Sequence, residues 1–263
     1  MKLSCQEQLL PGDDVLEKWE FAASAGFDGI ELRGMDDWSG RLDDLRAARD
    51  RGVVFSSVCV ISDRFIGDLD ADRRREAVEH MKQLLSGIAE LGGKGAITPA
   101  AFGLTSTALP PFETPRTPDE DRRVLLDALE ELGEHADREG ALVLLEPLNR
   151  YEDHMLNRLD QAVELCKAVG RDSVKAMGDL FHMNIEEDDP GESIRRADGY
   201  VAHVHLADSN RAHPGAGHLD FAPAFSALRD IGFDGYLAME CGIRGEARTV
   251  LPQAARYLRS LME

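Results

Sequence analysis

The feature that most restricts how this chain can fold is a regular alternation of short apolar runs with amphipathic segments. The runs are apolar on both faces, as strands buried in a parallel sheet are. Eight are predicted: Lys2–Cys5, Gly29–Leu32, Val53–Ile61, Gly95–Thr98, Leu142–Glu146, Val174–Asp179, Val201–Leu206 and Tyr236–Glu240. Between them, apolar residues at three- and four-residue spacing predict helices. The clearest are Asp14–Ser24, Leu42–Arg51, Arg73–Leu91, Pro118–Glu139, Leu159–Val169 and Ala247–Leu261.

Eight strand–helix units in 263 residues predict an α/β protein with a single (β/α)8 TIM barrel. We expect residues 1–263 to form one domain of this kind. An open, doubly wound sheet is the alternative. No glycine-rich GxGxxG or GxxxxGK[ST] loop follows the first strand, and this weakens the alternative.

Charge and composition narrow the partners and the compartment. Lys and Arg number 30 and Asp and Glu 49, so the formal net charge of −19 repels phosphate backbones and argues against nucleic acid as a partner. No apolar run approaches the roughly 18 residues of a membrane span, which predicts no membrane partner. The N-terminus shows no signal-peptide pattern, and the four cysteines stand singly, so we expect a soluble, cytoplasmic protein. A homo-oligomer and a monomer fit equally well.

Four metal-ligand residue types close four consecutive apolar runs in the second half of the chain. They are Glu146, Asp179, His205 and Glu240, each about one strand–helix unit from the next. In a barrel, these positions meet at the carboxyl-terminal mouth. Three carboxylates there would repel one another without a cation, and three oxygen ligands with one imidazole suit Mn²⁺, Mg²⁺ or Co²⁺. Taken singly, each could instead be a helix cap or a buried core residue.

Further polar residues accompany this quartet. Glu152 follows the fifth apolar run, and His182 lies one helical turn after Asp179. His203 shares a strand face with His205, where it could contact a substrate or orient a metal ligand. Arg211 follows the seventh run. The segment Ala101–Thr117 has no periodicity and follows the fourth strand, so we expect either a lid over the mouth or a plain surface connection.

The segments EPLNR, GDLFHMN, HVHLADSNR and LAMEC together resemble the xylose isomerase-like TIM barrels of the sugar phosphate isomerase/epimerase superfamily, and most of all its ketose 3-epimerases. The resemblance implies that Glu146, Asp179, His205 and Glu240 hold one divalent metal ion. It also implies that Glu152, His182 and Arg211 bind the substrate, and His203 is a further candidate for that role.

The function implied by this resemblance is that of an isomerase of carbohydrate metabolism. A divalent ion would polarise a free ketose, and Glu146 and Glu240 would exchange the proton on C3 across opposite faces through an enediolate, inverting that carbon. One alternative is a hydroxypyruvate or other keto-sugar isomerase, or an inosose-type dehydratase, on the same barrel. A second is a non-catalytic, metal-dependent sugar-binding subunit.

Overall fold

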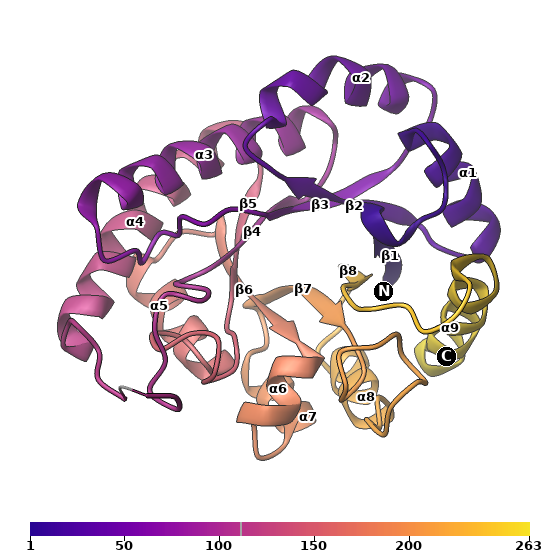
Figure 1. Cartoon of the computed structure of the whole chain (residues 1–263). Helices are drawn as coiled ribbons and strands as arrows, with labels where there is room; N and C mark the ends of the chain where they lie inside the picture. Colours follow the sequence, from indigo (N-terminus) through magenta and orange to yellow (C-terminus); the bar gives the residue numbers. More distant parts are fainter. Residues whose placement is uncertain (111) are drawn as a thin grey trace.

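Eight parallel strands close into one barrel (Figure 1). The structure is a computed structural model that describes residues 1–110 and 112–263. The strands are Lys2–Gln6 (β1), Gly29–Gly34 (β2), Phe55–Val60 (β3), Gly95–Pro99 (β4), Leu142–Glu146 (β5), Val174–Asp179 (β6), Val201–Leu206 (β7) and Tyr236–Met239 (β8). They follow one another around the barrel in chain order, and β1 pairs with β8 to close it. The predicted (β/α)8 barrel is therefore confirmed.

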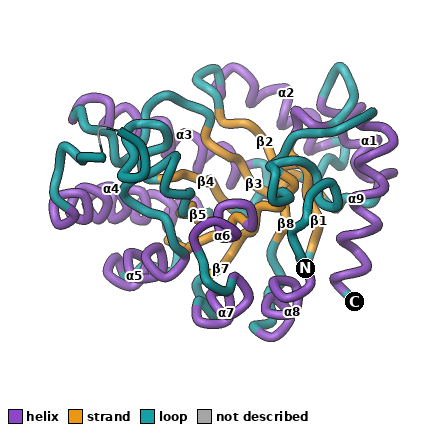
Figure 2. The backbone as a smooth tube through the Cα atoms, turned by 60° about the horizontal axis from the view of Figure 1, so that its bottom comes forward, coloured by secondary structure: helices purple, strands orange, loops and turns teal. Residues whose placement is uncertain are grey.

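Helices form a layer around the outside of the strands (Figure 1). They are Val15–Ala25 (α1), Trp38–Asp50 (α2), Ala71–Glu90 (α3), Pro118–Glu139 (α4), Leu159–Val169 (α5), Pro190–Arg196 (α7), Ala222–Asp230 (α8) and Ala247–Met262 (α9). A short helix, Leu180–Glu186 (α6), begins directly after β6 and lies in front of the barrel strands in Figure 2. The sequence pattern gave no bounds for α6, α7 or α8, because segments this short show too little of the helical period, although the possible helix cap at Asp179 anticipated a helix after β6. Among the described residues, no helix has the length and apolarity needed to cross a membrane.

The interior of the barrel has an apolar side and a polar side. The apolar cluster consists of Cys59, Ile97, Leu144 and Met177. On the polar side, the hydroxyls of Ser4 and Ser56 lie 2.6 Å apart, and the hydroxyl of Ser57 donates a hydrogen bond of 2.7 Å to Glu31. Glu31 and these serines are fully buried. A buried carboxylate needs such donors, because burial without hydrogen bonds would cost several kcal/mol. The polar side therefore supplies the hydrogen-bond donors that a charged group inside the barrel needs.

The long segment after β4 lies against the loop that follows β5. The backbone N–H of Ala101 donates to Asp153 (3.0 Å), and that of Gly103 donates to the carbonyl of Glu152 (2.7 Å). The hydroxyl of Ser106 donates to the carbonyl of Arg150. Residue 111 of the predicted lid or connection lies outside the described residues. The hydrogen bonds fix the start of the segment beside a loop that carries one of the predicted substrate-binding residues.

Candidate active site

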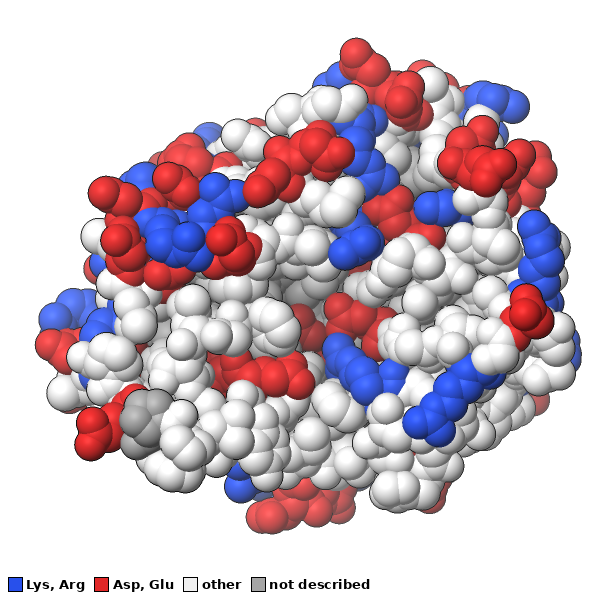
Figure 3. Space-filling model, in the orientation of Figure 1, with Lys and Arg blue, Asp and Glu red and all other residues white. Residues whose placement is uncertain are grey.

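A cavity of about 300 Å³ opens at the carboxyl ends of the strands. Figure 3 shows a central hollow on this face, with acidic side chains in its depth and a basic side chain beside them. One wall is polar and consists mainly of Glu146, Glu152, His182, Arg211 and Glu240. Most of the remaining lining is apolar, and we call it the apolar wall: Val60, Ile61, Phe65, Pro99, Phe102 and Leu148. Five of the predicted site residues therefore line a single cavity.

The four predicted metal ligands converge at the base of the polar wall. Glu146, Asp179 and His205 end or nearly end β5, β6 and β7, and Glu240 directly follows β8. Each offers a ligand atom, and the four atoms lie within 4.8 Å of one another. Nδ1 of His205 lies 3.1 Å from Glu146 Oε1 and 3.3 Å from Glu240 Oε2. Asp179 also caps α6, where its Oδ1 accepts a hydrogen bond from the N–H of Phe181. Asp179 therefore both caps a helix and belongs to the group of four predicted metal ligands.

Burial and crowding set the charges of this quartet. Burial raises the pKa of Glu146 to about 7. Burial is the largest influence on Asp179 and opposes its ionisation, but the charge and hydrogen bond of Arg211 act together with the neighbouring histidines and lower the pKa of that carboxyl to about 2. Burial disfavours a charged His205, yet the surrounding carboxylates, above all Glu31, raise its pKa well above the usual range. The site thus collects positive charge around three carboxylates that would otherwise repel one another.

The donor set fits a divalent cation. Three carboxylates and one imidazole are hard-to-borderline ligands, and such a set suits Mn²⁺, Mg²⁺ or Co²⁺ better than a thiolate-bound structural zinc. The convergence of all four ligand atoms within 4.8 Å supports this fit. Among the described residues that line the cavity, Arg211 carries the one permanent positive charge: Nη1 donates to Asp179 at 2.6 Å, and Nη2 donates to Glu240. The raised pKa of His205 adds a second positive charge, and a bound divalent ion would take the place of the proton on the ligating nitrogen.

Arg211 reaches this position from a tight turn. It adopts a left-handed backbone conformation (φ 57°), and its N–H donates to the carbonyl of Asp208. The Asp208 carboxylate accepts hydrogen bonds from the N–H groups of Gly215 (2.9 Å) and Leu219 (3.0 Å). The guanidinium carbon lies 4.7 Å from the centre of the Phe181 ring, which faces it. Asp208, which sequence reasoning did not single out, thus organises the turn that aims Arg211 into the cavity.

Asn149 joins two of the predicted substrate-binding residues. Its side-chain amide donates to Glu152 (3.0 Å) and lies 2.8 Å from Nδ1 of His182. The backbone N–H of Asn149 also donates to that nitrogen. Burial lowers the pKa of His182, so the ring is neutral, and a neutral ring that accepts at Nδ1 carries its proton on Nε2. Nε2 lies 3.7 Å from Asp179. Asn149 therefore fixes the His182 tautomer that offers a donor on the Asp179 side.

We expect Asn149→Ala to raise KM about tenfold, because Glu152 and His182 both lose the group that orients them. Asn157→Ala is the matched control. Its side chain lies in the same loop but donates only to the backbone carbonyls of Leu148 and Asp153. Steady-state kinetics and thermal melting of both variants measure the effect. Equal changes in KM for the two variants would show that Asn149 merely holds the loop.

Glu31, on β2, orients the two histidines of β7 across the interior of the barrel. Its carboxylate lies 2.9 Å from Nε2 of His205 and 2.8 Å from Nε2 of His203. The side-chain amide of Gln6 donates both to Glu31 (3.0 Å) and to Glu240 (2.9 Å). A carboxylate on the second ring nitrogen fixes the orientation of a metal-ligating histidine. His203 lies at Glu31 rather than in the cavity lining.

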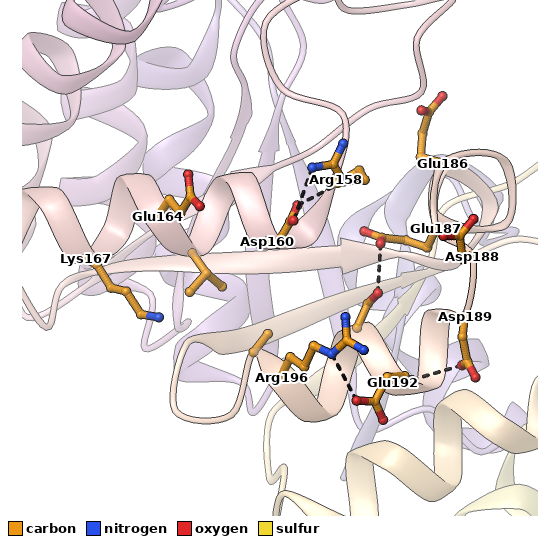
Figure 4. A pocket seen from close by; sticks show the side chains of 13 residues that line it. Arg158, Asp160, Glu164, Lys167, Glu186, Glu187, Asp188, Asp189, Glu192 and Arg196 are labelled. Atoms are coloured by element: carbon orange, nitrogen blue, oxygen red, sulfur yellow. Dashed lines mark hydrogen bonds and ion pairs between the residues drawn. The ribbon is translucent and has the colours of Figure 1, made fainter.

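A larger groove of about 470 Å³ lies away from the mouth, between α5 and the α6–α7 segment (Figure 4). Several of its acidic side chains form hydrogen bonds or ion pairs with nearby residues. Glu187 accepts hydrogen bonds from Leu159 and Ser193, Asp189 caps α7, and Glu192 pairs with Arg196. None of the predicted site residues lines it. Glu187 thereby links the start of α5 to α7.

A parallel barrel with three carboxylates and an imidazole at its mouth defines a class of protein, and comparison with known protein families identifies that class. The chain belongs to the xylose isomerase-like TIM barrel family, whose model matches residues 19–261. The family expected from the sequence motifs is therefore confirmed.

Individual relatives are sugar epimerases. The chain is 38% identical over 247 residues to the 3-dehydro-D-guloside 4-epimerase of Escherichia coli strain K12, covering 94% of both chains. It is 31% identical to the D-psicose 3-epimerase of Agrobacterium fabrum over 84% of this chain and 77% of the relative. The apo crystal structure of a 3-keto-D-glucoside 4-epimerase from E. coli superposes with a TM-score of 0.94, at 36% identity over 99% of both chains. The structure of the Clostridium cellulolyticum D-psicose 3-epimerase with D-tagatose has a TM-score of 0.86 at 24% identity over the whole of both chains, a likeness of fold.

Proposed function

We propose that this protein is a keto-sugar epimerase that inverts the carbon next to a ketone. The observation that carries the proposal is the pair Glu146 and Glu240. These two carboxylates come from opposite ends of the second half of the barrel and meet at one histidine nitrogen in a single cavity. Inversion needs one group to remove a proton from one face and another to return a proton on the opposite face. The relatives with epimerase names support the same proposal.

Under this proposal Glu146, Asp179, His205 and Glu240 hold one divalent ion, Mn²⁺, Mg²⁺ or Co²⁺. When bound, the ion supplies Lewis-acid polarisation of the ketone, which makes the neighbouring C–H more acidic. Glu240 is oriented by the side-chain amide of Gln6. Because the reaction is reversible, each carboxylate is the base for one epimer and the acid for the other.

The remaining polar residues of the cavity position the sugar. The Nε2–H of His182 and the guanidinium of Arg211 donate to oxygens near the reacting carbon, and the Glu152 carboxylate accepts from a hydroxyl. Held in this way, the substrate presents its C–H bond between the two glutamates. His203 acts through Glu31, which it contacts at 2.8 Å, and so helps to orient His205.

Two substrate classes satisfy this chemistry. A 3-keto-glycoside would be inverted at C4, and a free ketose, the substrate predicted from the sequence, would be inverted at C3. In both, the inverted carbon is next to the ketone. The 38% identity over 94% of both chains to a 4-epimerase favours the keto-glycoside. The 31% identity to a D-psicose 3-epimerase supports the free ketose as the second candidate.

Proton NMR in D₂O separates these reactions. Protein reconstituted with Mg²⁺ or Co²⁺ is incubated with 3-keto-glucosides, free ketohexoses and ketopentoses, hydroxypyruvate and inosose. We expect loss of the H4 signal of a 3-keto-glucoside and growth of its C4 epimer. Loss of H3 from a ketose would select the second candidate. Absence of exchange with every sugar, despite bound metal, would contradict the epimerase proposal in favour of a dehydratase or a binding subunit.

A further inference from the structure

The two walls of the cavity differ in chemistry, and only the polar wall is used by the proposed reaction. The apolar wall is built by the loops after β3 and β4, with Phe65 from the first and Phe102 from the second. Their ring centroids lie 6.0 Å apart at an interplanar angle of 72°, a stable edge-to-face arrangement. Phe65 is buried, whereas Phe102 leaves 48% of its surface exposed. An uncovered aromatic face therefore lies at the rim of the cavity.

Phe102 is held in this position rather than left free on the surface. The residues on both sides of it donate backbone hydrogen bonds to the loop after β5: Ala101 to Asp153 and Gly103 to Glu152. The same loop carries the Glu152 side chain on the polar wall. The aromatic face and the polar wall are therefore fixed relative to each other, as the two ends of a binding site must be.

We infer that the substrate is a glycoside with an apolar, preferably aromatic, aglycone, and that Phe102 and Phe65 form the subsite for this aglycone. The inference rests on the proposed epimerase function. In a pyranose ring, C1 lies opposite C4. Placing C4 between Glu146 and Glu240 directs the C1 substituent away from the charged wall. Hydroxyl groups of a free sugar would lose water against an apolar wall and gain no hydrogen bond there, whereas an aromatic aglycone gains from burial and ring contact.

The size of the cavity sets a limit on this aglycone. A volume of about 300 Å³ is at the small end of the range for ligand sites. One sugar ring and one small aromatic ring suit it better than a long oligosaccharide. The cavity therefore limits the aglycone to a compact ring.

The test compares phenyl and methyl 3-keto-glucosides as substrates of the metal-reconstituted protein. We expect kcat/KM to be roughly tenfold higher for the phenyl glycoside, the scale of one good aromatic contact. Phe102→Ala should abolish this preference, and Phe102→Trp should keep it. Phe112→Ala is the matched control, because Phe112 is 58% exposed in the same segment but does not line the cavity. That variant should retain the tenfold ratio.

Calorimetric binding of the two glycosides separates failure of the subsite from failure of the proposed function. Suppose that the phenyl and methyl glycosides are turned over with the same kcat/KM, both by the unaltered protein and by Phe102→Ala. This result would agree with the proposed epimerase function and contradict the subsite. Tighter binding of the phenyl glycoside, lost in Phe102→Ala but without epimerisation, would support the subsite and contradict the epimerase. A change of molecular mass in solution for Phe102→Ala alone would assign the ring to an interface between copies, and the subsite would be wrong.

Discussion

Glu240→Gln is expected to lower the rate of epimer interconversion by about a thousandfold or more, the scale of losing a general acid–base group. The amide is nearly isosteric with the carboxylate, and its oxygen can still accept the hydrogen bond from Gln6 that Glu240 receives at 2.9 Å. Folding should therefore be unaffected. Steady-state rates, thermal melting and metal content measure the effect together, because Glu240 is also a proposed metal ligand.

Solvent exchange gives this variant a diagnostic signature. If Glu146 and Glu240 serve opposite faces, Glu240→Gln should still let Glu146 exchange the proton of one epimer with D₂O while interconversion stops. Glu164→Gln, an exposed substitution on α5, is the control and should leave both processes intact. Full interconversion by Glu240→Gln, with metal bound, would show that Glu240 is not a base.

Removal of the divalent ion is expected to reduce activity at least a hundredfold and to lower Tm by roughly 5–10 °C. A ligand present at about 100 times its Kd stabilises the native state by about 2.7 kcal/mol, and each kcal/mol shifts Tm by roughly 2–4 °C in a protein of this size. The physical reason is the crowding of three carboxylates and one imidazole within 4.8 Å, an arrangement that a divalent ion bound only by the native state would stabilise. Chelation followed by readdition of Mn²⁺, Mg²⁺ or Co²⁺, with activity and melting as readouts, tests this expectation.

His205→Ala is the matched variant for the metal experiment. It removes the imidazole ligand and leaves the three carboxylates in place, so added ions should raise Tm much less than in the unaltered protein. Full activity in exhaustively chelated protein, with no ion detected by elemental analysis, would rule out the proposed metal dependence.

The strands could be predicted well from the sequence. Each of the eight strands was predicted, because runs such as Leu142–Glu146 and Val174–Asp179 are buried on both faces, and these two match the observed bounds. Helix α2 begins at Trp38, four residues before the predicted start at Leu42. The fully buried Trp38 continues the helical spacing of Leu42 and Leu45, but Ser39 and Gly40, which have low helix propensity, separate it from them.

The candidate site was predicted where its residues end strands, and it was missed where residues act through contacts across the barrel. Glu146 and Glu240 close apolar runs, so barrel geometry alone brings them together. Gln6 and Glu31 become neighbours only through the pairing of β1 with β2, and Asn149 meets His182 only when β5 and β6 lie side by side. A single sequence contains no periodic signal for such contacts. Asn149 stands in the EPLNR segment, which was the one local pointer to it.

The two walls of the cavity come from different halves of the chain, and this separation bears on how such a barrel diversifies. The four convergent ligands belong to the second half, from Glu146 to Glu240, whereas most of the apolar wall comes from residues 60–102. Mutations in the loops after β3 and β4 can therefore accumulate, and new substrates can be acquired, while the reaction chemistry is inherited unchanged as long as Gln6 and Glu31 are kept. For laboratory evolution, the loops after β3 and β4 are the segments to randomise.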